Sequence, residues 1–252
     1  MVMHYPNRLK VSLRIMLVAA LPLFLSACLV VAGCGGNEGP SDVESVVARA
    51  QDAGEAIDSY HMVLSMSFEG AEAGQVKTEE LVIDIAGDNV SLKDTFYDPE
   101  TGEGTVIQEA IRIGDKQWGK DLTGGGWVEE QATLDEETAI SYTSHISDFV
   151  SNSVSAQMLE EEEMNGVTAV HLRFELSPEN VSSLLTDIPR SNLESNAGGQ
   201  VDIWVDATSY YPVKYEMVFR NVTLGSGYND VDVRITIDIT DINRLLKIRP
   251  PV

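Results

Sequence analysis

Few side chains in this sequence could carry chemistry, and their spacing does not favour catalysis. Both cysteines, Cys28 and Cys34, lie within the first 34 residues. No thiol remains after them, which excludes cysteine catalysis, cysteine-rich zinc sites, iron–sulfur clusters and internal disulfides there. Three histidines follow, His61, His145 and His171, and they fall on separate predicted elements. Neither HExxH nor GxSxG occurs. We therefore expect no catalytic residue, no metal and no cofactor, and we predict that the protein is not an enzyme.

Two acidic clusters could suggest cation binding, but both have a simpler interpretation. Residues Glu160–Glu163 are consecutive glutamates. In a strand their side chains would alternate between faces, which favours a solvated sheet edge. Asp98, Glu100 and Glu103 lie in a predicted turn without the spacing of an EF-hand loop. Gly124–Gly126 lacks the Lys-Ser/Thr that follows a phosphate-binding loop, so we interpret it as a plain loop.

The N-terminal segment has the layout of a secretory signal peptide. Arg8, Lys10 and Arg14 precede an apolar run at residues 15–33, and no acidic residue occurs before Glu38. Small residues and a cysteine end the run, as Val31-Ala32-Gly33-Cys34. This ending resembles the lipobox of bacterial lipoproteins, whose cysteine becomes lipidated. The resemblance implies a protein held by acyl chains, such as palmitate, at the extracytoplasmic face of the cell membrane.

Two cysteines fit the lipobox, because Leu25-Ser26-Ala27-Cys28 also matches. Use of Cys28 would leave an apolar stretch at the start of the mature chain, whereas residues 35–40 after Cys34 are polar and flexible. We therefore favour Cys34 over Cys28. An uncleaved anchor helix is the other interpretation, since the 19 residues of the apolar run approach the ~20 needed to cross a bilayer.

The chain is strongly acidic, with 17 Lys and Arg against 40 Asp and Glu and a formal net charge of −23. Residues 1–34 hold three of the cations and none of the acids, so the remainder carries 14 against 40, a net −26. Such a surface repels nucleic acid and anionic headgroups. We expect no nucleic-acid partner. The simplest role of the charge is solubility.

Hydrophobic periodicity predicts three helices. The first should start at Ser41, with Ser41 and Glu44 forming a capping box. The second fits residues 134–150, with apolar residues on one side. The third should open at Ser177-Pro178 and end before Pro189, with an apolar stripe at Val181, Leu184, Leu185 and Ile188.

Alternating apolar residues predict about eleven strands joined mostly by short turns. Asn165-Gly166 between alternating segments is a strong hairpin signal, because a type I′ turn needs positive φ at both positions. Residues 191–199 are expected to form a loop. Short connections imply antiparallel pairing. We predict an α+β fold: a large curved antiparallel sheet, a half-barrel, with about three helices on its concave side.

Four segments carry a family resemblance. They are Ile113–Lys120 followed by Trp127, Asn165–His171, Val201–Asp206 followed by Tyr211–Lys214, and Asp241–Asn243 followed by Ile248–Pro250. In this order they resemble the LppX/LprAFG-type lipoproteins of the LolA/LolB-like superfamily, and the resemblance covers about residues 41–250. It implies a half-barrel whose concave face and helices enclose an apolar cavity for the acyl chains of lipids or lipoglycans.

The cavity candidates are apolar positions on the predicted strands and the third helix. They are Met62, Leu64, Met66, Phe68, Leu81, Ile83, Ile111, Leu172, Phe174, Leu184, Leu185, Ile203, Tyr215, Met217, Phe219, Ile235 and Ile237. An acyl chain requires only an apolar volume, so its site leaves little polar signature in a sequence. The same residues could instead fill a solid core.

These observations give a domain plan and a functional prediction. Residues 1–33 are expected to be the lipoprotein signal peptide, 34–40 the lipidated cysteine and tether, and 41–252 a single LolA-like lipid-binding domain. The predicted function is to bind acyl chains and carry or transfer lipids within the cell envelope. Any transporter or acceptor protein is unidentified. The alternative is a structural or sensor lipoprotein with a solid core that presents the domain to a protein partner.

Overall fold

The computed structural model describes residues 42–70, 74–131, 134, 146–184, 193–222 and 230–251. For residues 74–75, 146–148, 182–184 and 193–197 it describes the backbone alone. Within these ranges the chain forms one antiparallel sheet of twelve strands and three helices, which confirms the predicted fold class. The predicted signal peptide and tether, with both cysteines, lie outside the described residues.

Helix α1 (Val43–Gly54) starts one residue later than predicted. Its N-cap is Asp42, whose Oδ1 accepts a hydrogen bond from the Ser45 backbone N–H at 2.8 Å. This contact satisfies one of the free N–H groups at the helix start, so the capping box centred on Ser41 was wrong. The buried side of α1 includes Val46, Val47 and Ala50.

The other two helices are short in the described part of the chain. Helix α3 (Ile146–Asn152) covers only the end of the predicted second helix. Leu134 is not helical: its N–H donates to Gln117 Oε1, and its carbonyl accepts from Arg112. Residues 135–145 of that prediction lie outside the described residues. Helix α4 (Pro178–Leu184) begins with proline after Ser177, as predicted.

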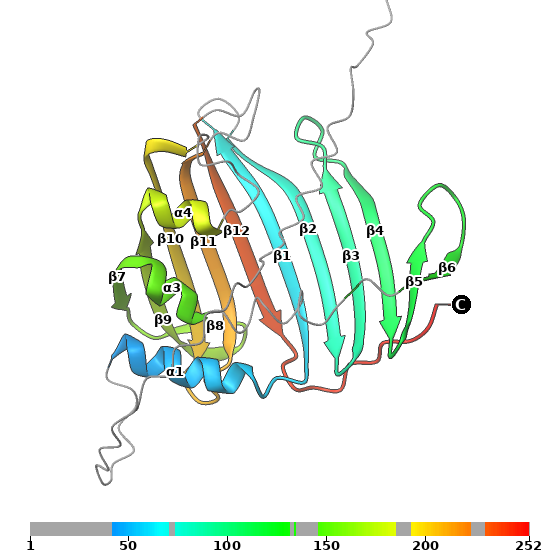
Figure 1. Cartoon of the computed structure of the whole chain (residues 1–252), viewed down its shortest axis with the longest axis horizontal. Coiled ribbons are helices and arrows are strands. Elements are labelled where there is room, and N and C mark those ends of the chain that lie inside the picture. The colour runs from blue at the N-terminus through cyan, green and yellow to red at the C-terminus, as the bar shows by residue number, and fades with distance from the viewer. Residues whose placement is uncertain are drawn as a thin grey trace, which may run out of the picture.

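The sheet has one more strand than predicted. Its strands are β1 (Ser59–Gly70), β2 (Gly74–Ala86), β3 (Asn89–Tyr97), β4 (Gly104–Ile113), β5 (Lys116–Lys120), β6 (Trp127–Glu130), β7 (Ser153–Met158), β8 (Glu162–Met164), β9 (Val167–Leu176), β10 (Leu193–Asp206), β11 (Pro212–Val222) and β12 (Val231–Thr240). The spatial order is β6-β5-β4-β3-β2-β1-β12-β11-β10-β9-β7, with β8 also paired to β9 (Figure 1). The first strand of the domain thus pairs with the last, near the middle of an open sheet.

The strands differ from the prediction in two places. The segment expected to run as one strand from 156 to 164 is split into β7 and β8, which both pair with β9. Strand β10 starts at Leu193, inside the predicted loop. The predicted hairpin turn is confirmed, with φ of 50° at Asn165 and 83° at Gly166.

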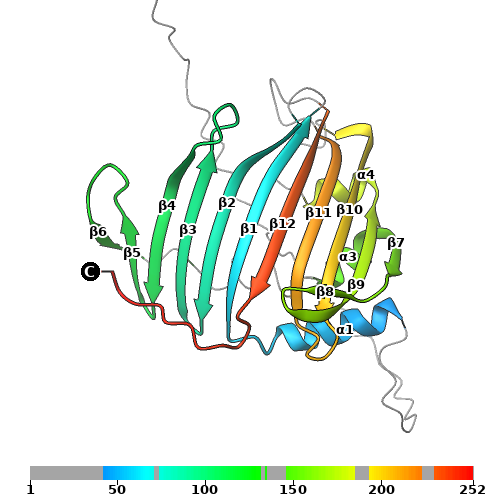
Figure 2. The same cartoon turned by 180° about the vertical axis from the view of Figure 1, so that it is seen from behind.

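The three described helices lie on the same side of the sheet, in front of β7 and β9–β11 in Figure 1 and behind them in Figure 2. We call this side the inner face and the opposite side the outer face. Register assigns residues to each face: Met62 pairs with Ile239 and Ile83 on the inner face, while His61 pairs with Thr240 and Asp84 on the outer face. No helix in the described ranges is long and apolar enough to cross a membrane.

The C-terminal segment is fastened to the start of the sheet through one asparagine. Asn243 Oδ1 accepts from the Asp58 backbone N–H, and its own N–H donates to the Ser59 carbonyl, both at 2.8 Å. The side-chain amide also donates to Tyr211 Oη at 2.9 Å. These contacts hold the segment after β12 against the beginning of β1.

Candidate functional site

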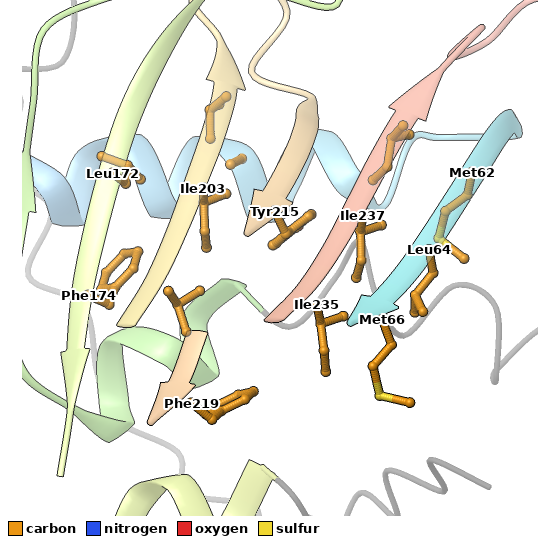
Figure 3. Close-up of a cluster of buried hydrophobic side chains, with 14 of the residues drawn as sticks. Met62, Leu64, Met66, Leu172, Phe174, Ile203, Tyr215, Phe219, Ile235 and Ile237 are labelled. Carbon is orange, nitrogen blue, oxygen red and sulfur yellow. The ribbon is translucent and has the colours of Figure 1, made fainter. Parts of the chain in front are cut away.

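A continuous apolar band crosses the inner face. Its buried members are Met62, Leu64, Met66, Ile83, Leu172, Phe174, Ile203, Tyr215, Phe219, Ile235 and Ile237. In Figure 3 the labelled side chains come from five neighbouring strands, β9 to β12 and β1, and form one layer. Phe68, Leu81 and Met217 are partly buried and pack against this band. Burial of apolar surface stabilises a fold by about 25 cal/mol for each Å² removed from water.

Strand register explains why these residues share one face. One cross-strand row runs from β2 to β9 through directly paired residues: Leu81, Leu64, Ile237, Tyr215, Ile203 and Leu172. A second row runs through Met66, Ile235, Met217, Val201 and Phe174. Directly paired residues point to the same side of an antiparallel sheet. The band is therefore a product of alternation and register together.

The described helices pack mainly on one half of the band. Helix α4 packs on β10 and β9, α3 on β7 and β9, and α1 on α3 and β7. The inner faces of β12, β1 and β2 continue the apolar rows beyond these strands. Met62 there is 0% exposed and Leu64 is 4% exposed.

The two rows end at a pair of carboxylates on β2 and β3. Asp94 pairs with Leu81, and Glu79 pairs with Phe96, so the two acids are diagonal neighbours on the inner face. Burial, together with the charge of Asp94, raises the pKa of Glu79 to about 7. Burial also raises the pKa of Asp94, against the opposing effect of a hydrogen bond from the Thr95 backbone. These acids mark the border of the apolar surface.

Polar atoms without a hydrogen-bond partner are rare inside proteins. In the described part of the chain two buried side-chain atoms have none, Asp94 Oδ1 and Tyr215 Oη. Both lie on the inner face, in the same cross-strand row. Tyr215 is 1% exposed, and burial followed by the influence of Tyr60 raises the pKa of its phenol. The phenol therefore stays protonated and is available as a donor.

Most of the predicted cavity residues lie on the inner face, but Ile111 does not. It pairs with Ser91 and Trp118 on the outer face, while the small Ala110 takes the inner position beside Leu92. Helix α4 ends at Leu184, whose side chain is not described, and Leu185 lies outside the described residues. Periodicity identified the apolar positions of β4 but gave no sign of which face they occupy.

On the outer face a polar cluster surrounds His171. Its Nε2 lies 2.8 Å from Asp202 Oδ1, and its Nδ1 lies 2.9 Å from Glu162 Oε1. The His171 ring stacks on the Trp204 ring, with their centroids 4.4 Å apart. The Lys214 ammonium lies over the same Trp204 ring, 5.3 Å from its centroid. Glu162 thus has a specific structural partner, which its place in a run of glutamates did not reveal.

Asp202 is the centre of this cluster. Burial alone would raise its pKa, but hydrogen bonds from Arg173, Gln200 and His171 outweigh that effect and lower it. Arg173 Nε donates to Asp202 Oδ1 at 2.7 Å. The cluster joins β8, β9 and β10 through the buried His171 and Asp202 and their more exposed partners Glu162 and Arg173. We assign it a structural role, because such networks hold strands in register.

The remaining ionisable residues form no candidate metal site in the described ranges. No group of three or more His, Cys, Asp or Glu side chains there could hold a metal ion. His61 Nδ1 lies 2.7 Å from Asp84 Oδ1 on the outer face, away from His171. Asp98 Oδ1 accepts from the Glu100 and Thr101 backbone N–H groups, so this acid shapes its turn.

The fold and site define an open antiparallel sheet with helices over one apolar face. The chain is similar to the lipoprotein LppX of Mycobacterium tuberculosis, with 10% identity, 82% of this chain and 100% of that chain covered, and a TM-score of 0.48. It is similar to LprF from Mycobacterium bovis, with 13% identity, 85% and 100% coverage, and a TM-score of 0.49.

A LolA superfamily protein from Nitrosomonas europaea is similar at 13% identity, with 82% of this chain and 94% of that chain covered and a TM-score of 0.27. Neither a family model nor a curated protein sequence matches the chain. These solved structures include the lipoproteins and the superfamily that the sequence motifs resemble. The function proposed below rests on the residues and motifs of this chain.

Proposed function

We propose that this protein is a membrane-anchored extracytoplasmic lipoprotein that binds acyl chains against its inner face and carries or transfers lipids within the cell envelope. The observation that carries the proposal is the extent of the apolar band. Its rows continue over β12, β1 and β2, beyond the strands on which the described helices mainly pack. An acyl chain needs a surface of this chemistry and few polar contacts.

Two further features support this role. The N-terminal segment resembles a lipoprotein signal, which would hold the domain beside a membrane that supplies lipid. The band also contains Met62, Met66 and Met217, whose unbranched side chains adapt to different apolar shapes. Binding rather than catalysis is proposed, because the inner face presents an apolar surface with two acids at its border.

Native mass spectrometry tests the proposal on the full chain purified from a membrane-containing bacterial host. Non-covalent lipid masses are expected in addition to any covalent anchor. A clean mass, with no uptake of offered phospholipid, would favour the alternative of a solid core that serves a protein partner. The covalent anchor and the bound ligand are distinguished by collisional activation, which releases only the ligand.

Two neighbouring positions on β1 provide a matched pair of variants. Leu64 faces the apolar band and Val63 faces the opposite side of the sheet. Leu64→Trp should lower lipid occupancy while the fold is kept, because the added ring takes space from a displaceable ligand. Val63→Trp should leave occupancy unchanged. If the band were a solid core, Leu64→Trp would overpack it and cost about 1–3 kcal/mol of stability.

A further inference from the structure

Tyr215 holds the most deeply buried unsatisfied polar atom of the apolar band. Its side chain is 1% exposed, and Oη has no hydrogen-bond partner among the described residues. Its directly paired neighbours are Ile237 on β12 and Ile203 on β10. The ring of Phe149, from α3, lies 6.4 Å away between centroids. A donor left unpaired in such surroundings is costly, and native proteins keep few of them.

A buried water is a poor partner for this hydroxyl. Ordered interior waters usually make two to four hydrogen bonds, roughly three on average. Among the neighbours named for Tyr215, Ile237, Ile203 and Phe149 offer a water no hydrogen bond and only the Tyr60 phenol could, which is fewer than the usual three partners. A ligand that is apolar along its length and carries a single acceptor matches the site better.

We propose that the Tyr215 hydroxyl donates a hydrogen bond to the carbonyl oxygen of an acyl group in the bound lipid. The inference rests on the proposed function and makes it more specific, because it identifies the acyl carbonyl as the polar group of the lipid that the inner face binds. The raised pKa of the phenol supports this role, since a protonated phenol can donate to a neutral carbonyl.

The contact would also fix where the lipid lies. Tyr215 is in the row that continues through Ile237, Leu64 and Leu81 to Asp94. Five strands at a spacing of about 4.8 Å place Asp94 roughly 19 Å from Tyr215 along that row. A carbonyl at Tyr215 would therefore leave the apolar positions of β12, β1 and β2 for the hydrocarbon chain.

The test compares two lipids that differ only at the carbonyl. The full chain, after removal of co-purified lipid, is titrated with a diacyl phosphatidylethanolamine and with its dialkyl ether analogue of equal chain length. The unsubstituted protein should prefer the ester lipid. Tyr215→Phe should bind the ester lipid about 5- to 10-fold more weakly, as expected for one lost hydrogen bond, and bind the ether lipid as before.

Tyr97→Phe is the matched control. Tyr97 lies on the outer face, where its hydroxyl contacts Glu80 Oε1 at 3.4 Å. Removal of this hydroxyl should leave the ester preference unchanged. Equal binding of both lipids by the unsubstituted protein, or an unchanged preference in Tyr215→Phe, would overturn the inference alone. Binding of neither lipid would contradict the proposed function itself.

Thermal unfolding of the lipid-free protein gives a second, independent readout. Tyr215→Phe removes an unsatisfied hydroxyl and keeps the ring, so its melting temperature should equal or exceed that of the unsubstituted protein. A fall of several degrees would mean that the hydroxyl already has a partner inside the protein. That result would overturn the assignment to the lipid.

Discussion

Glu79 connects residue chemistry with the behaviour of the inner face. Its pKa is raised to about 7 by burial and by the nearby Asp94. A carboxyl that binds its proton more tightly in the folded state stabilises the fold most below its unfolded pKa, near 4.5. That stabilisation is lost as the pH rises through about 7. The ionised Glu79 carboxylate therefore lowers the free energy of unfolding at alkaline pH.

Glu79→Gln should remove this pH dependence. We expect the variant to be more stable than the unsubstituted protein by about 1–2 kcal/mol at pH 8 and nearly equal at pH 4, after allowance for partial exposure. Urea unfolding at several pH values measures this difference. Glu80→Gln, which removes the next acid along the strand and its contact with Lys77 on the outer face, should give no such gain. Parallel pH profiles for Glu79→Gln and the unsubstituted protein would contradict the prediction.

The residues most visible in the sequence are not those of the candidate site. The segments that carry the family resemblance bring His171, Trp204 and Lys214 together on the outer face. Asn165, in the same set, donates from its side-chain amide to the Val213 carbonyl at 2.9 Å. These residues brace neighbouring strands. The apolar band has no such signature, because many apolar side chains satisfy the same requirement, and the unpaired hydroxyl of Tyr215 depends on tertiary packing.

Among the elements, α4 and β10 depend on one close approach. A Cβ atom at Gly199 would lie 3.0 Å from Val181 Cγ2 and 3.1 Å from both Leu176 Cδ1 and Phe219 Cδ1. Glycine here lets the helix side chain Val181 rest directly on the strand. Glycines without side chains also explain why the start of β10 was not predicted. Gly198-Gly199 interrupts the apolar alternation, so these residues were predicted to be a loop.

Gly199→Val should therefore separate α4 from the sheet. We expect a loss of about 1–3 kcal/mol in the free energy of unfolding, as for other overpacked sites, measured by urea denaturation. Gly126→Val is the control, because a Cβ at Gly126 would meet no atom within 4 Å. Equal stability of the two variants would show that the helix does not require the close contact.

Alternation correctly predicted the strands that bury one face. The apolar positions of β12, Val231 to Ile239, all lie on the inner face and are all buried, because a period of two matches the pleat of a strand. Periodicity could not assign Ile111 to its face, since either set of side chains on β4 could point inward. The face on which Ile111 lies is set by the strand register, which depends on the partner strands.

At the scale of the whole molecule, the proposed lipid anchor would determine where the domain can act. Both candidate cysteines precede the described residues, and Cys34 is the one followed by a polar, flexible segment. Cys34→Ala should abolish incorporation of radiolabelled palmitate in the bacterial host. Cys28→Ala is the control and should be labelled like the unsubstituted protein. Full labelling of Cys34→Ala would move the lipidated residue to Cys28.

The pairing of β1 with β12 has a consequence for how the protein is made. Strands β1 to β6 pair in chain order, and so do β9 to β12, so each group can assemble from strands that are neighbours in the sequence. The ladder from His61 to Glu69 requires residues 232–240, which are synthesised much later. Until then β1, which carries Met62 and Leu64, is an open edge strand and a hazard for aggregation. The central seam of the sheet therefore joins the first and the last strand of the domain, and we expect it to close only after residues 231–240 are available.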